Sequence, residues 1–103
     1  MSEVKGKIVL ITGGALGMGR EVARLFARDG ARIVLWDLRQ EDLNKTAEEL
    51  KALGAEIHTY ICDVTNRQTV YETADKVRKE VGVVDILDNN AGVVFGGEFL
   101  EVP

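Results

Sequence analysis

The sequence holds only one cysteine, one histidine and one proline among its 103 residues. A lone cysteine, Cys62, cannot form an internal disulfide, so the composition favours a reducing compartment and predicts a cytoplasmic protein. We expect its thiol to pack as a small hydrophobic group. His58 has no second histidine with which to build a metal site, and we expect its side chain to be solvated.

Basic residues are also scarce, since 13 lysines and arginines stand against 17 aspartates and glutamates, for a net charge of −4. Nucleic acid binding favours a basic surface, so this balance argues against nucleic acid as the main partner. Long hydrophobic runs are missing too, because a run such as Ile8–Ile11 is far shorter than the ~18 residues of a membrane span. The first residues show no signal-peptide pattern.

What is present is typical of a folded protein, with 46% hydrophobic and 29% charged residues. The length predicts a single domain over residues 1–103. Glycines at positions 30, 54 and 82 each follow an amphipathic segment, as expected at a helix end. Apolar residues recur at helical spacing in three segments: Met18, Val22, Leu25 and Phe26; Leu43, Ala47, Leu50 and Leu53; Val70, Ala74, Val77 and Val81.

Polar residues on these helical segments give two further predictions. Thr65 and Gln68 match a capping box that would open the third helix. The row formed by Arg20, Arg24 and Arg28 is expected to be a solvated face of the first helix.

Short runs rich in β-branched residues lie between the helical segments, at Lys7–Thr12, Arg32–Asp37, Glu56–Cys62 and Val83–Asp88. The first two are apolar at successive positions, which is typical of strands buried on both faces of a parallel sheet. In the third run, Glu56, His58 and Tyr60 stand at alternate positions and would lie on one face, which predicts an edge strand. The pattern predicts a three-layer α/β fold of Rossmann type: a four-stranded parallel sheet in the order 3-2-1-4 with three helices. We expect the first two helices on one face, the third on the other, and a ligand between strands one and four.

A glycine-rich turn, Thr12–Gly19, follows the first expected strand and opens the first helix. Its glycines permit a tight turn and let a pyrophosphate approach the backbone N–H groups at the positive end of a helix. A glycine-rich turn is equally compatible with a purely structural role. Its position between a strand and a helix favours dinucleotide binding.

Asp37 ends the second expected strand, 24 residues after Gly13. A carboxylate there can accept hydrogen bonds from the ribose hydroxyls and repels a 2′-phosphate, which favours NAD over NADP. Arg39 is the counterargument because a nearby arginine can hold that phosphate, whereas Leu16 supplies no second basic group. Asp37 is also a candidate cap for the helix that follows. Trp36 beside it is expected in the core or at its rim.

Three motifs together resemble the short-chain dehydrogenase/reductase family. Thr12–Gly19 is similar to the family's Thr-Gly-x-x-x-Gly-x-Gly motif, Asp63-Val64 to its Asp-Val motif, and residues 89–92 to its Asn-Asn-Ala-Gly motif. They occur in the family's order and spacing, and the resemblance extends over the whole chain. Residues 35–37 and 61–64 are most similar to the branch that acts on retinoids and steroids.

The resemblance implies an NAD-binding site and assigns a role to each matching residue. The pyrophosphate and nicotinamide side would be lined by Gly13, Leu16, Gly17, Met18 and Gly19. Asp37 would hold the adenosine ribose, with Leu38 beside it in the cofactor-binding set. Asp63 would bond the adenine amino group, and Val64 would lie against the ring. The ribose side would also be lined by Asn90, Ala91 and Gly92.

Two expectations concern the strand that precedes the last motif. The resemblance implies that Asn89 and Thr12 tie this strand to the first turn. Asp88 stands where the family has an aliphatic residue, and a charge on an edge strand discourages edge pairing. We expect strand four and a half-bare sheet face to form an apolar patch through which two copies make a symmetric dimer, with Asp88 in solvent or at its rim.

The family's catalytic serine and Tyr-x-x-x-Lys pattern have no match, since neither Tyr60 nor Tyr71 is followed four residues on by lysine. The resemblance therefore implies an NAD(H)-binding half of an oxidoreductase, without catalysis of its own. Three alternatives stay open: an oxidoreductase active only when a second chain completes it, a folded fragment that self-associates without a ligand, and a module for another adenosine ligand such as S-adenosylmethionine.

Overall fold

The chain alternates strands and helices in the predicted order, and the computed structural model describes residues 2–91. A short 3-10 helix, η1 (Ser2–Val4), precedes the strands β1 (Ile8–Thr12), β2 (Arg32–Asp37), β3 (Ile57–Ile61) and β4 (Ile86–Asn89). The helices are α1 (Gly17–Arg28), α2 (Gln40–Ala52) and α3 (Arg67–Glu80). Each ends two residues before one of the three glycines that predicted its end. None of these helices is long and apolar enough to cross a membrane.

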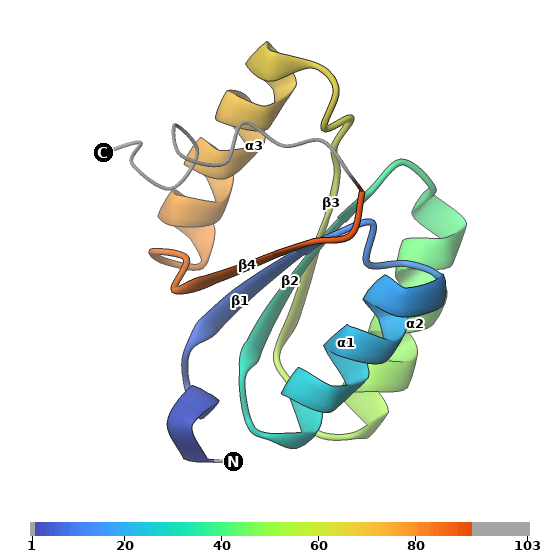
Figure 1. Ribbon diagram of the computed structural model, residues 1–103, viewed down its shortest axis with the longest axis vertical. Helices are drawn as coiled ribbons and strands as arrows, with labels where there is room; N and C mark the ends of the chain where they lie inside the picture. Colours follow the sequence, from blue (N-terminus) through green and yellow to red (C-terminus); the bar gives the residue numbers. More distant parts are fainter. Residues whose placement is uncertain (1, 92–103) are drawn as a thin grey trace.

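The four strands form one parallel sheet in the order β3-β2-β1-β4, as predicted. Helices α1 and α2 cover one face and α3 lies on the other (Figure 1). All residues of β1 are buried, which confirms that it lies inside the sheet, and β3 takes the predicted edge. Because the strands are parallel, their carboxyl ends meet at one edge, where the glycine-rich turn lies.

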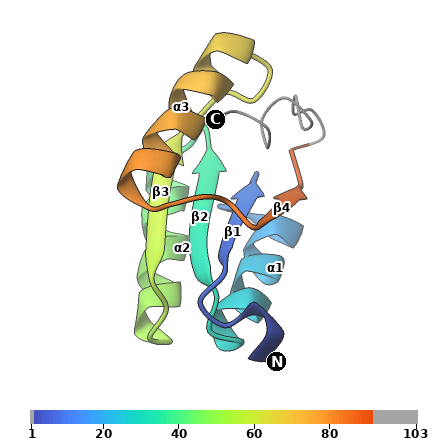
Figure 2. The same cartoon turned by 90° about the vertical axis from the view of Figure 1, so that its left-hand side faces the viewer.

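The face of the sheet under α3 is closed, and the expectation of a half-bare apolar face is wrong for the two central strands. Leu10 and Val34 are fully buried there. They pack in a cluster with α3, and Val81 and Val84 from the segment that follows α3 also contact this cluster. Figure 2 shows this segment crossing in front of β2 and β1 on its way to β4.

Helix α1 buries a different stripe from the predicted one, because it lies very close to the sheet. Met18 and Leu25 are 75% and 59% exposed, while Val22 and Phe26 are only partly buried. The buried positions are small: Gly19, Ala23 and Ala27. Small side chains allow the close approach, and a search for large apolar residues selects the neighbouring positions instead.

The other two helices follow their predicted stripes more closely. In α2, Leu43, Ala47 and Leu50 are buried, and Leu53 just beyond the helix is half-exposed. In α3, Val70 and Val77 are buried, and Ala74 and Val81 pack partly buried against the same cluster.

The start of α3 differs from the predicted capping box by one residue. Asn66 is the cap, and its side-chain oxygen accepts a hydrogen bond from the Thr69 N–H over 3.0 Å. The Thr65 hydroxyl donates to Asp63 instead. The expected cap therefore belongs to the loop before the helix.

The expected solvated arginine face is wrong for two of its three members. Arg20 and Arg24 both bind Glu49 of α2, each with an Nε–Oε distance of 2.8 Å. These hydrogen bonds, with Arg20 as the larger contributor, hold the pKa of the Glu49 carboxyl below its usual range. The contact joins α1 to α2, the two helices that cover the same face of the sheet.

Candidate functional site

The glycine-rich turn packs so tightly that two of its positions accept only glycine. Gly13 has a φ of +63°, and a Cβ added to it would lie 3.3 Å from the Ala91 nitrogen. A Cβ on Gly19, in the first turn of α1, would overlap the Gly13 carbonyl oxygen. The first turn of the helix therefore lies directly against the turn that precedes it.

The polar groups at the amino end of α1 are backbone N–H groups, because no side chain caps this end of the helix. Its N-cap residue is Leu16, whose side chain cannot accept a hydrogen bond, and its first turn holds no acidic residue. Leu16 and Met18 are 45% and 75% exposed. The first N–H groups of a helix have no partner within it and carry its positive dipole end, so this terminus suits an anion. Gly17, with a φ of +58°, begins the helix.

Asp37 holds the glycine-rich turn from the end of β2. Its carboxylate accepts hydrogen bonds from the Leu38 N–H over 2.7 Å and from the Ala15 N–H over 3.2 Å. The carbonyl oxygen of Trp36 accepts from the N–H groups of Gly13 and of the residue after it. The alternative interpretation of Asp37 as a helix cap is wrong, since Arg39 is the N-cap residue of α2 and the Asp37 carboxylate binds N–H groups outside that helix.

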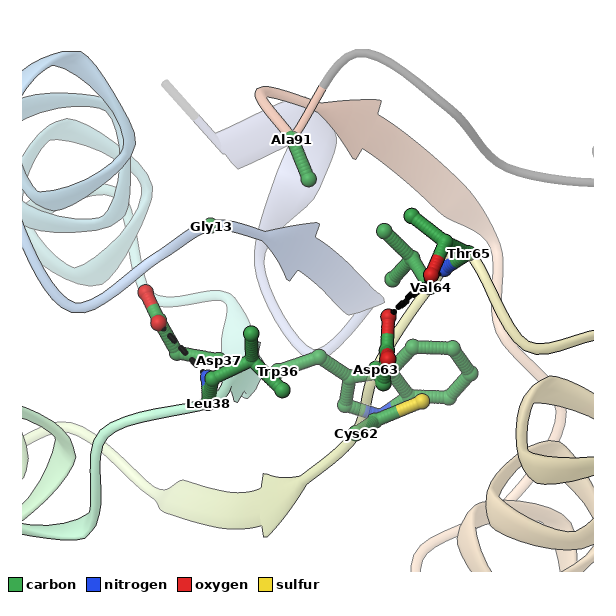
Figure 3. Close-up of a pocket in the computed structure, with 9 residues that line it drawn as sticks. All are labelled: Gly13, Trp36, Asp37, Leu38, Cys62, Asp63, Val64, Thr65 and Ala91. Atoms are coloured by element: carbon green, nitrogen blue, oxygen red, sulfur yellow. Dashed lines mark hydrogen bonds between the residues drawn. The ribbon is translucent and has the colours of Figure 1, made fainter.

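A pocket of about 190 Å³ opens at the carboxyl edge of the sheet (Figure 3). It is smaller than the roughly 300–1,000 Å³ of pockets that enclose whole ligands, so it suits one ring of a larger ligand. Figure 3 shows Asp37 and Asp63 on opposite sides. The lining residues are Gly13, Trp36, Asp37, Leu38, Cys62, Asp63, Val64, Thr65 and Ala91.

Asp63 presents an ionised carboxylate to this pocket. Its Oδ1 accepts from both the hydroxyl and the N–H of Thr65, over 2.6 and 2.9 Å. These bonds hold the pKa of the Asp63 carboxyl below its usual range. Because both bonds converge on Oδ1, Oδ2 is the oxygen that can accept from an amino group in the pocket. Val64 beside it is buried and gives the pocket an apolar wall.

The predicted tie between β4 and the first turn is confirmed. The Thr12 hydroxyl donates to Asn89 Oδ1 over 2.7 Å, and the Ala91 N–H donates to the same oxygen over 3.2 Å. The Asn90 N–H donates to the carbonyl oxygen of Thr12. These bonds place Ala91 against Gly13. Gly92, the last residue of the motif, lies outside the described residues.

Asp88 is neither in free solvent nor unpaired. It is half-buried in β4 opposite Ile11, and its Oδ1 accepts a hydrogen bond from Asn90 Nδ2 over 2.7 Å. The carboxylate therefore has a polar partner inside the last motif, which lowers the cost of its partial burial.

Four residues of the site were not predicted as part of it. One is Thr65, which was expected only in a capping box and lines the pocket. Trp36 and Cys62 were expected only to pack, and both line the pocket as well. Thr46 of α2, a fully buried residue, donates its hydroxyl to the Ala15 carbonyl oxygen over 2.7 Å. The signal that could have found Thr46 is its place between Leu43 and Ala47, on the apolar stripe of the helix.

Comparison with known proteins agrees with this geometry. A family model described as short chain dehydrogenase matches residues 7–103. The chain belongs to the short-chain dehydrogenase family.

The curated relatives confirm the predicted similarity to dehydrogenases named for retinoids and steroids. Short-chain dehydrogenase/reductase family 16C member 6 of Bos taurus is 53% identical over 98% of this chain and 32% of its own length. Epidermal retinol dehydrogenase 2 of Mus musculus is 50% identical over 97% of this chain and 33% of its own length. Estradiol 17-beta-dehydrogenase 11 of Homo sapiens is 49% identical over 89% of this chain and 31% of its own length. The chain thus spans about a third of the length of these relatives.

Solved structures of other short-chain dehydrogenases share the fold. A xylitol dehydrogenase bound to NAD+ is 34% identical with a TM-score of 0.80, and the match covers 82% of this chain and 33% of that chain. The L-sorbose reductase of Gluconobacter frateurii, in complex with NADPH and L-sorbose, is 34% identical with a TM-score of 0.83. The match covers 89% of this chain and 35% of that chain. The shared fold therefore accommodates both cofactors and does not by itself choose between them.

Proposed function

We propose that this chain binds NAD(H) as the cofactor-binding part of a short-chain dehydrogenase. The observation that supports this most directly is the position of the Asp37 carboxylate, which lies between the glycine-rich turn and the pocket. Ligands of open α/β sheets bind at this edge, outside the carboxyl ends of the strands.

The residues present fit a dinucleotide along this edge. Gly13 and Gly19 leave the backbone bare where a pyrophosphate would meet the amino end of α1, with Leu16, Gly17 and Met18 lining that side. The size of the pocket suits an adenine ring, between the Asp63 carboxylate and the Val64 side chain. Asn90 and Ala91, with Gly92 beyond the described residues, would line the ribose on the nicotinamide side. The bound cofactor would supply the hydride that is exchanged with a substrate.

The same arrangement favours NAD(H) over NADP(H). A carboxylate at Asp37 would accept hydrogen bonds from the adenosine ribose and repel a 2′-phosphate. Arg39 is the nearby cation that could offset this repulsion, but it lies within 3.9 Å of the Asp42 carboxylate on α2. The Arg39 side chain is 71% exposed, which leaves its charge screened by water.

Calorimetric titration of the chain with NADH, NADPH and S-adenosylmethionine tests the proposal. We expect NADH to bind more tightly than NADPH, and Asp37→Ala to weaken NADH binding by about tenfold, since hydrogen bonds to a charged group are lost. Glu48→Ala, which removes an exposed carboxylate elsewhere on α2, is the matched control and should leave the preference for NADH in place. Equal affinity of the wild type for NADH and NADPH would refute the role of Asp37, and binding of S-adenosylmethionine alone would refute the dinucleotide assignment.

We propose further that the 103-residue chain transfers no hydride on its own. Neither Tyr60 nor Tyr71 has the lysine partner of the family's catalytic pattern. A positioned acid contributes about 10²–10⁴-fold to such a reaction. Incubation with NAD+ and secondary alcohols, including a steroid, and with retinol should yield no NADH. Turnover that a single substitution in this chain abolishes would refute this proposal.

The third part of the proposal is self-association of the chain through β4. Within the described part of the chain β4 pairs only with β1, so its other side presents the peptide groups of an edge strand. A second copy related by a two-fold axis offers the same strand in return. Sedimentation over a range of concentrations should show a dimer, and a monomer up to millimolar concentration would exclude it.

We also retain a cytoplasmic location as a proposal. It rests on the single cysteine, because Cys62 is a buried free thiol and the chain has no second cysteine with which to form a disulfide. Fractionation of cells that produce the protein would test it.

A further inference from the structure

Ala15, in the glycine-rich turn, is held at both of its backbone polar groups by two residues of one neighbouring segment. Its N–H donates to Asp37 Oδ2 at the end of β2, and its carbonyl oxygen accepts from the Thr46 hydroxyl on α2. Ala15 and Thr46 are each 1% exposed. The N–H belongs to the peptide unit before Ala15 and the carbonyl to the one after it, so the two bonds fix the turn on both sides of one Cα.

The surroundings leave this contact no easy substitute. Thr46 lies between Leu43 and Ala47 on the buried stripe of α2, where an unpaired hydroxyl or carbonyl is costly. Gly14, just before Ala15, is packed so closely that an added Cβ would meet the Leu35 side chain at 2.7 Å. The turn therefore has little room to shift unless the Thr46 bond is removed.

We propose that Thr46 is a positioning residue that sets the preference for NAD(H) over NADP(H) through Asp37, an inference that rests on the proposed function. The Thr46 bond keeps the Ala15 N–H directed at Asp37 Oδ2. That N–H and the Leu38 N–H together fix the plane of the carboxylate. With the plane fixed, the remaining acceptor positions are presented to the ribose, and the negative charge stays where a 2′-phosphate would lie.

Removal of the hydroxyl should release this chain of contacts. Without Thr46 Oγ1 the buried Ala15 carbonyl has no donor, and a displacement of the Ala15 Cα that brings the carbonyl to another donor also moves the N–H away from Asp37. A carboxylate with one fixed bond fewer can rotate out of the position that binds the ribose and excludes the phosphate. The loss of one hydrogen bond is worth about three- to tenfold in affinity, and we expect the NADH-to-NADPH preference to fall by that factor.

The test compares Thr46→Ser with Thr46→Ala, because these variants differ only in the hydroxyl. Calorimetric titration with NADH and NADPH should give the wild-type preference in Thr46→Ser and a reduced one in Thr46→Ala. Leu50→Val, in the same buried stripe one turn further along, controls for general loosening of α2. It should lower the melting temperature and leave the preference unchanged.

A second measurement separates positioning from stability. In the Asp37→Ala background, Thr46→Ala should cause no further change in preference, since Thr46 acts through the Asp37 carboxylate. An NADH-to-NADPH preference that Thr46→Ala leaves unchanged in the wild-type background would overturn the inference about Thr46. So would a loss of preference on Thr46→Ala that is as large in the Asp37→Ala background as in the wild type. Failure of the wild-type chain to bind either dinucleotide would instead overturn the proposed function.

Discussion

The Thr12 hydroxyl donates to the side-chain oxygen of Asn89 over 2.7 Å and thereby joins the carboxyl ends of β1 and β4. Thr12 is fully buried at the point where the strand leaves the sheet and enters the glycine-rich turn. The bond fixes the separation of the two loops that border the pocket.

Thr12→Val keeps the shape of this side chain and removes the bond. It should destabilise the fold by about 0.5–1.5 kcal/mol, the net contribution of one hydrogen bond, because the exposed Asn89 oxygen keeps the Ala91 N–H as a donor. Urea unfolding followed by circular dichroism would measure the change. Thr59→Val on the edge strand β3 is the control and should change stability by no more than about 0.5 kcal/mol. Equal stability of Thr12→Val and the wild type would show that the bond adds nothing.

Gly19→Ala should disrupt the cofactor site more than it disrupts the protein. The new methyl group would overlap the Gly13 carbonyl oxygen, so the turn has to move away from α1, at a cost of about 1–3 kcal/mol. We expect NADH binding to be lost while the chain still unfolds cooperatively. Gly54→Ala is the control, because Gly54 has a positive φ but open space around it. It should cost about 1–2 kcal/mol of stability through backbone strain and leave NADH binding unaltered. Normal NADH affinity in Gly19→Ala would contradict the tight packing.

The contact of Glu49 with Arg20 and Arg24 predicts a pH dependence of stability. The pKa of the Glu49 carboxyl is lowered in the folded state, so its stabilisation is fully present above its usual pKa near 4.5 and is lost as the pH falls through the lower folded value. Glu49→Gln should flatten the acid limb of the stability curve and lower stability at pH 7 by less than about 1 kcal/mol. Glu48→Gln, at the exposed neighbouring position, is the control. Identical acid limbs for Glu49→Gln and the wild type would argue against this contact in solution.

Asp88→Val tests whether a charge limits pairing along β4. The variant removes a half-buried carboxylate from an edge strand and adds a side chain that favours strands, so we expect larger oligomers or aggregation. Sedimentation measures the size distribution, and circular dichroism checks that the fold of each subunit is unchanged. Glu41→Gln, at an exposed position on α2 and away from β4, serves as the control. An oligomer distribution identical to that of the wild type would remove this role for Asp88.

Much of the sheet and the outline of the site follow from short-range patterns. Consecutive apolar residues in β1 and β2, and glycines between strand and helix, determine the strand order and the edge where a ligand binds. The proximity of Asp37, at the end of β2, and Asp63, two residues beyond the end of β3, follows from the same pattern, because the carboxyl ends of parallel strands meet at one edge.

The remaining features depend on contacts between distant residues. The place of Thr46 on the apolar stripe of α2 indicates burial, but no pattern within the helix indicates the partner of its hydroxyl in another loop. The pairing of Arg20 with Glu49 is likewise invisible to a pattern within one helix. The buried stripe of α1 was missed because close packing selects small residues, such as Ala23, which hydrophobic spacing ranks below Met18 and Leu25.

The hydrogen bonds of Ala15 and Asp37 have a thermodynamic consequence. Since hydrogen bonds within the protein hold the turn and the carboxylate, a dinucleotide should have little backbone conformational entropy to remove when it binds. Association should therefore be limited by diffusion and orientation rather than by loop closure. Differences in affinity between variants with an intact turn should then appear in the dissociation rate, whereas variants that release Ala15 should also associate more slowly.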